Sequence, residues 1–150
     1  MSLAKWAEYG WLRAEPTSPA EIEDLMGIVN RDLHDAQVQA ISEDRRFEAA
    51  FNAARTAANV ALRACGYRTA SQLGHHLKTI ESLEFTIQAD PRLIQKLRVF
   101  SKKRNATSYD SAGNVSEQEL EEMIRIAEGL RQRVAEWLRE NHPELTKRSE

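Results

Sequence analysis

The sequence predicts an all-α fold, a five-helix up-and-down bundle with a short extra helix at its N-terminus. Ala, Leu, Glu, Arg and Gln recur throughout, while only 6 Gly and 4 Pro interrupt the 150 residues, so helix propensity is favourable along nearly the whole chain. The prolines fall where helices can begin, and strand signals are absent. We therefore expect a single helical domain over residues 1–150, with its core at about 18–141.

The first bundle helix is predicted to begin at Ser18, after a short amphipathic stretch around residues 6–11. Ser18 suits the N-cap, Pro19 suits the first helical position, and Glu21 stands where it would complete a capping box. The apolar face of this helix consists of Ile22, Leu25, Met26, Val29, Leu33 and Ala36.

The second helix is predicted to begin after Ser42 and to end at Gly66, a residue suited to a left-handed C-cap. Its many alanines allow a neighbouring helix to approach closely. Its apolar face consists of Phe47, Phe51, Ala54, Ala58, Ala61, Leu62 and Cys65. A third helix is expected from about Thr69 to Ile87. Its aligned apolar residues are Leu73, Leu77, Ile80, Leu83 and Ile87.

The fourth helix is predicted to start at Asp90-Pro91 and to run to near Ser108. Its inward residues are Leu93, Leu97 and Phe100. A polar loop at 110–114 precedes the last helix, for which Ser116 and Glu119 form a capping box and which ends at 141–143. The apolar face of the last helix consists of Leu120, Met123, Ala127, Leu130, Val134 and Trp137.

Composition excludes several classes of protein. A formal net charge of −2 gives no overall field that would draw the chain to DNA or to an anionic membrane. The single cysteine, Cys65, and the absence of a signal-like N-terminus predict a reduced, cytoplasmic protein, and no apolar run approaches the roughly 20 residues that cross a bilayer. Zinc and di-iron motifs are absent, so no metal or cofactor is expected.

Arg104 is the first candidate functional residue. At 100° per residue it lies only about 20° from Leu97 around the helix axis, so a guanidinium is aimed along the apolar stripe. Such a group needs an acidic partner, a position at the open end of the bundle or an anionic ligand. Arg104 ends the basic run that begins at Lys102, in which Lys103 is a second candidate for phosphate binding.

The segment from Arg104 to Asp110 resembles the signature of the HEPN superfamily of small α-helical bundles. Members carry an arginine near the end of a late helix, commonly a polar residue such as Asn directly after it, and a histidine four to six residues further on. Arg104 and Asn105 match the first two elements, and the chain length and the position before the last helix agree. The resemblance covers roughly residues 18–141 and implies that Arg104 stabilises phosphate charge.

The histidine of that signature is replaced in this chain. Residues 109–111 are Tyr, Asp and Ser, so Tyr109 stands where members that cleave RNA without metal carry the histidine. Tyrosine, with a pKa near 10, is a poorer proton shuttle at neutral pH than histidine. The resemblance thus leaves two alternatives: a non-cleaving nucleotide or RNA binder, or a variant endoribonuclease in which Arg104, Asn105 and Tyr109 are catalytic.

Other polar residues could complete the site. The resemblance implies an acidic residue of an early helix against the motif arginine, and Asp32 or Asp35 would serve, although Arg31 is also placed to pair with Asp35. His76 is predicted to face inward. It is either a buried histidine that forms a hydrogen bond with a neighbour or a base that replaces the missing histidine of the signature. A polar row on the second helix either lines a dimer cleft or meets water, and it consists of Asn52, Arg55, Asn59 and Arg63.

Two functions from different classes follow. The first is a nucleotide- or RNA-binding protein, which by its resemblance we expect to be a homodimer whose segments 104–109 face one cleft. The resemblance also implies a partner, because many prokaryotic members are toxins neutralised by a nucleotidyltransferase-type antitoxin. The second is a non-catalytic module for protein–protein interaction, in which Arg104 forms a structural ion pair with Asp32 or Asp35.

Overall fold

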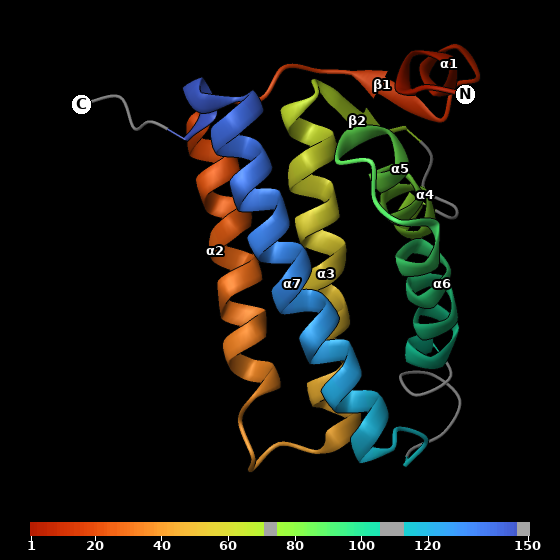
Figure 1. Cartoon of the computed structure of the whole chain (residues 1–150), viewed down its shortest axis with the longest axis vertical. Coiled ribbons are helices and arrows are strands. Elements are labelled where there is room, and N and C mark those ends of the chain that lie inside the picture. Colours follow the sequence, from red (N-terminus) through yellow and green to blue (C-terminus); the bar gives the residue numbers. More distant parts are fainter. Residues whose placement is uncertain (71–74, 106–112, 147–150) are drawn as a thin grey trace.

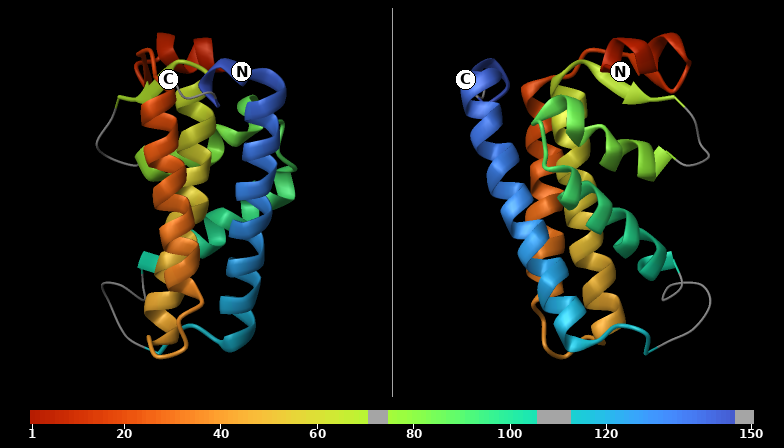
Figure 2. Two further views of the ribbon diagram at one scale, coloured as in Figure 1. Left: turned by 90° about the vertical axis from the view of Figure 1, so that its left-hand side faces the viewer. Right: turned by 45° about the vertical axis from the view of Figure 1, so that its right-hand side comes forward.

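The computed structural model describes residues 1–70, 75–105 and 113–146 of the chain. Three long helices form the body of the bundle (Figure 1): α2 (Pro19–Ala36), α3 (Glu43–Ala64) and α7 (Glu117–Asn141). Helix α2 runs antiparallel to both α3 and α7, and α6 (Pro91–Asn105) lies across α3 on the side away from α2 (Figure 2). The predicted all-α, up-and-down arrangement is therefore confirmed.

Helix α3 is the centre of the bundle. It contacts α2 and α7 along its length and also meets α6 and the short helices α4 (His75–Glu81) and α5 (Leu83–Thr86). Alanine side chains allow this close packing. Because alanine has only a methyl group beyond the backbone, the axes of neighbouring helices can approach to the short end of their usual separation. Its alanines with no exposed surface are Ala50, Ala53, Ala54, Ala57, Ala58 and Ala61.

Most predicted helix ends are confirmed. The hydroxyls of Ser18 and Ser42 accept hydrogen bonds from backbone N–H groups three residues later, and Ser116 forms a complete capping box with Glu119. Gly66 follows α3 with a φ of +88°, the left-handed conformation that glycine adopts readily. The capping box at Ser18 is only half formed, because Glu21 directs its carboxylate to Thr17 and Arg63 instead.

The expectation that the chain contains no strands is wrong. The N-terminal helix α1 (Leu3–Glu8) is followed by β1 (Leu12–Ala14), which pairs antiparallel with β2 (Tyr67–Thr69), the segment directly after α3. Each strand has three residues, too few to show an alternating pattern. The pair holds α1 against the end of the bundle (Figure 1), where Trp6 packs on Leu12 and Leu62.

The third predicted helix, Thr69 to Ile87, is also wrong as a single element. Thr69 belongs to β2, and the helical part is divided at Ser82 into α4 and α5. The Ser82 hydroxyl donates to the Thr79 carbonyl oxygen at 2.6 Å, a local bond that competes with helical pairing. Leu77, expected to face inward, is 37% exposed, whereas Ile80, Leu83 and Ile87 are buried. Leu73 lies outside the described residues.

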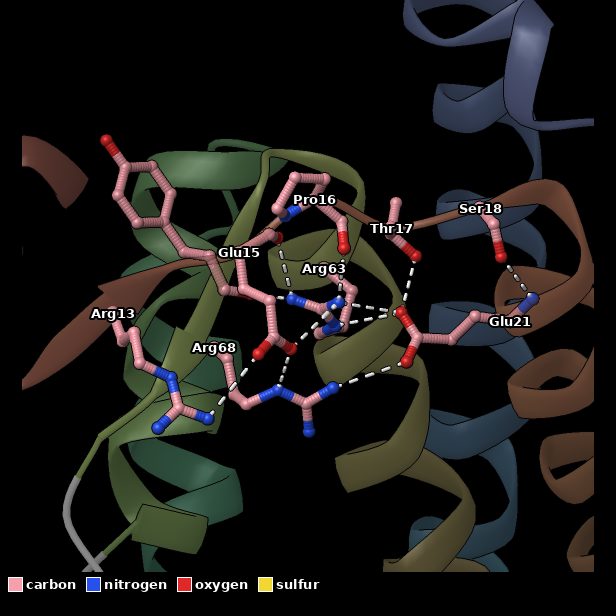
Figure 3. A network of polar contacts seen from close by, with 9 residues as sticks. Arg13, Glu15, Pro16, Thr17, Ser18, Glu21, Arg63 and Arg68 are labelled. Atoms are coloured by element: carbon pink, nitrogen blue, oxygen red, sulfur yellow. Dashed lines mark hydrogen bonds and ion pairs between the residues drawn. The ribbon is translucent and has the colours of Figure 1, made fainter.

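A buried arginine joins the strand pair to the bundle (Figure 3). Arg63 of α3, 2% exposed, donates to Glu21 Oε1 from Nη2 at 2.8 Å and to the carbonyl oxygens of Glu15, Pro16 and Tyr67 at 3.0–3.1 Å. Arg68 of β2 binds both carboxylates, Glu15 and Glu21. Both alternatives predicted for the polar row, a dimer cleft or water, are therefore wrong for Arg63, which holds three chain segments together.

Stability is expected to fall in acid through this network. The hydrogen bond from Thr17, followed by that from Arg63, lowers the pKa of Glu21 below its ordinary value of 4.5. Because the unfolded chain takes up the proton first, the contribution is complete above pH 4.5 and is lost as pH falls through the lowered folded-state pKa. Urea unfolding at several pH values should show this loss, and Glu21→Gln should reduce it; an unchanged pH profile in that variant would contradict the assignment.

Within the described ranges, no helix is both long enough and apolar enough to cross a bilayer.

Candidate functional site

Arg104 lies in the last turn of α6, beside a cleft of about 620 Å³ between α4 and α6. Phe51 of α3, His76 and Leu77 of α4, and Val99 and Arg104 of α6 contribute to its lining. Leu77 is 37% exposed and Val99 is 49% exposed, so the cleft has an apolar part as well as a cationic one. A volume of this size lies within the range of small-molecule sites.

The guanidinium of Arg104 is half-buried and incompletely paired. Its Nε is buried without a hydrogen-bond partner in the part of the chain that the structure describes, while Nη1 donates to Asn105 Oδ1 at 3.1 Å. The group also lies 5.8 Å from the centre of the Phe51 ring, a cation–π distance. An unpaired buried N–H beside a cleft is a group that an incoming acceptor would stabilise.

A second arginine stands close to the first. Arg55 of α3 is half-buried, and its Nε is likewise buried without a partner among the described residues. Its Nη1 lies 3.0 Å from His76 Nδ1. Burial lowers the pKa of Arg55, and the charge of Arg104 lowers it further, against the opposing effect of Asp32. Arg104 lines the cleft, and Arg55 lies behind His76, which also lines it. An anion bound in the cleft would offset the repulsion between the two cations.

Asp32 is buried near these arginines, but it has other partners. Its carboxylate accepts hydrogen bonds from Arg31 Nε and Nη2 at 3.2 and 3.1 Å, and from Asn52 Nδ2. The pairing expected between Arg31 and Asp35 is therefore wrong, because Arg31 turns to Asp32. Asp35 is half-buried at the C-terminal end of α2. Asn52 connects Asp32 to Arg55 by hydrogen bonds, and among the described residues neither aspartate bonds directly to Arg104.

Carboxylates already neutralise much of the basic surface of α6. Lys103, a candidate phosphate-binding residue, lies 3.3 Å from Glu119, and Lys96 lies 2.8 Å from Glu122. A backbone hydrogen bond at Ser116 and then the bond from Lys103 lower the pKa of Glu119, which keeps that carboxylate charged. Lys102 is exposed at the edge of the cleft. Of the three consecutive cations at 102–104, Arg104 is therefore the residue that is both partly buried and incompletely paired.

The remaining predicted site residues are placed only in part. Asn105 is exposed at the end of α6 and accepts the hydrogen bond from Arg104. Tyr109 lies outside the described residues. The sequence did not indicate the importance of Arg55. Its spacing of three residues from Asn52 could be read from the sequence, but the helices that would pack against this polar row could not.

The fold and site together define a class of protein, a helical bundle in which one arginine lines a cleft between the helices and a second contacts a histidine of the same cleft. The model of the HEPN domain matches residues 22–137, which extend from α2 to near the end of α7, and the chain belongs to this family. Comparison with curated proteins and with solved structures finds no match to the chain.

Proposed function

We propose that the cleft beside Arg104 binds a phosphate group of RNA or of a nucleotide. The observation that carries this proposal is the pair of half-buried guanidiniums, Arg55 and Arg104, each with a buried Nε that lacks a hydrogen-bond partner in the described part of the chain. Phosphate oxygens are acceptors that suit the planar fork of arginine, and an anion offsets the repulsion between the two cations.

Binding of a fluorescein-labelled RNA hexamer, followed by anisotropy, tests this proposal. We expect saturable binding whose affinity falls as the salt concentration rises. Even a small number of phosphate contacts releases counterions from the RNA, and added salt opposes that release. A matched hexamer with uncharged methylphosphonate linkages should bind poorly. Equal binding of both hexamers, or none of either, would reject a phosphate site.

The finer proposal is a metal-independent endoribonuclease. In it, Arg104 stabilises charge on the phosphate while the ribose 2′-hydroxyl loses its proton to water and its oxygen forms a bond to phosphorus. The bond to the 5′-oxygen breaks, and Tyr109 donates its phenolic proton to that leaving oxygen and regains one from solvent. Purified protein should then cleave RNA in the presence of EDTA, and Arg104→Ala and Tyr109→Phe should each abolish cleavage. Activity that survives both substitutions would show that another residue or a contaminant is responsible.

We also propose that the protein is a homodimer through the surface around the cleft. Leu77 and Val99 are large apolar residues exposed there, 37% and 49%, and burying them in a partner would be favourable. Val99→Asp should shift the protein to monomer in sedimentation equilibrium. The matched control is Ile41→Asp, a 39% exposed apolar residue in the connection between α2 and α3. A dimer that tolerates Val99→Asp would exclude this surface.

The family also supports the proposal of a toxin whose antitoxin is a nucleotidyltransferase. Expression of the chain should then arrest growth, and co-expression of a nucleotidyltransferase encoded beside it should relieve the arrest. The alternative, a non-catalytic interaction module, required Arg104 to be locked to Asp32 or Asp35; Asp32 instead bonds Arg31 and Asn52. This observation favours the binding site over the module.

A further inference from the structure

A chain of four polar side chains leads from the buried interface of α2 and α3 to the cleft. Asp32 of α2, 5% exposed, accepts a hydrogen bond from Asn52 Nδ2, and Asn52 Oδ1 accepts one from Arg55 Nη2. Arg55 Nη1 then lies 3.0 Å from His76 Nδ1 of α4. His76 and Arg104 both line the cleft, so the chain of contacts ends where the proposed anion binds.

The direction of every hydrogen bond in this chain is fixed by chemistry. The Asp32 carboxylate can only accept, which turns the amide nitrogen of Asn52 toward it and the amide oxygen toward Arg55. A guanidinium can only donate, so His76 Nδ1 must be the acceptor of the bond from Arg55. A ring that accepts at Nδ1 is neutral and carries its one proton on Nε2.

We propose that His76 donates its Nε2–H to an oxygen of the phosphate bound by Arg104. Asp32, Asn52 and Arg55 are then positioning residues that hold the ring in this tautomer. The inference rests on the proposed phosphate site and names a second group that binds the ligand there. In this tautomer Nε2 has no lone pair to accept a proton, so His76 acts as a hydrogen-bond donor to the ligand and not as a general base.

The tautomer can be measured directly on the full-length protein. A long-range proton–nitrogen spectrum of the 15N-labelled chain distinguishes Nδ1–H, Nε2–H and doubly protonated rings, and the His76→Gln spectrum identifies the signal of His76. We expect the Nε2–H form at neutral pH. A His76 ring protonated at Nδ1, in either the neutral or the charged form, would overturn the inference without any ligand.

Ligand binding supplies the second readout. Titration with adenosine 5′-monophosphate should shift the His76 Nε2 signal, whereas adenosine, which lacks the phosphate, should not shift it. In calorimetry, Arg55→Met should weaken binding of the monophosphate about tenfold. Methionine offers no donor to His76 Nδ1, so the ring is no longer held in the form that donates to the phosphate. Arg55→Lys, which keeps a donor for Nδ1, should restore the tautomer and most of the affinity.

Matched variants separate this inference from the proposed site. Arg45→Met removes an exposed arginine from the same helix, α3, and should change neither the tautomer nor the affinity. Monophosphate binding that depends on Arg104 but leaves the His76 signal unmoved would overturn the inference and keep the site. Failure of the monophosphate and of the RNA hexamer to bind at all would overturn both.

Discussion

Arg63→Leu is expected to lower the free energy of unfolding by about 3–5 kcal/mol, because several acceptors lose their donor at about 1–3 kcal/mol for each one that is left buried and unpaired. The substitution removes a 2% exposed guanidinium that donates to Glu21 and to three backbone carbonyl oxygens. Those acceptors come from the segment before α2 and from β2, and leucine offers them no donor. Urea unfolding followed by circular dichroism measures the loss, which corresponds to a fall in Tm of roughly 6–20 °C for a chain of this size.

Arg13→Leu is the matched control for that variant. Arg13 belongs to the same network, lying 3.6 Å from Glu15, but its side chain is 59% exposed. Exposed ion pairs contribute about 1 kcal/mol or less, so this variant should unfold nearly as the unsubstituted protein does. Equal losses in the two variants would show that burial is not what makes Arg63 important.

Arg104→Gln is expected to weaken binding of the RNA hexamer by about 10- to 100-fold. Charge-assisted hydrogen bonds contribute about 1.5–3 kcal/mol each, and a half-buried guanidinium at a cleft can form two of them with one phosphate. Arg104→Lys keeps the charge but not the planar fork, so it should recover only part of the affinity. Anisotropy titrations at one fixed salt concentration measure all three proteins.

Lys102→Gln controls for charge alone, since Lys102 is an exposed cation on the edge of the same cleft and two residues away on the same helix. Its loss should weaken binding only severalfold and should do so mainly at low salt. A larger effect from Lys102 than from Arg104 would mean that the RNA binds to the surface of α6 and not in the cleft.

The amphipathic patterns of α2, α3, α6 and α7 were sufficient to predict these helices, because burial of one apolar face follows directly from spacing. Serine, proline and glycine marked their ends through local hydrogen bonding and backbone conformation. The strand pair could not be predicted in this way. Its three-residue segments are held by contacts between positions more than fifty residues apart, Leu12 with Thr69 and Ala14 with Tyr67.

Arg104 could be predicted as a candidate residue because its angular position relative to Leu97 depends on one helix only. Arg55 and His76 could not be assigned, since they come together from α3 and α4 and contact across a helix interface. The same limit applies to Lys103, whose neutralising partner Glu119 lies on α7.

The sequence by itself determined the helical class, most helix boundaries, the HEPN resemblance and the arginine on the apolar stripe, because each depends on residues near one another in the chain. Only the tertiary structure decided that Arg63 is a buried link and that Asp32 reaches His76 through Asn52 and Arg55. Long side chains can meet many partners, and the packing of the helices selects which of them lies within hydrogen-bonding distance.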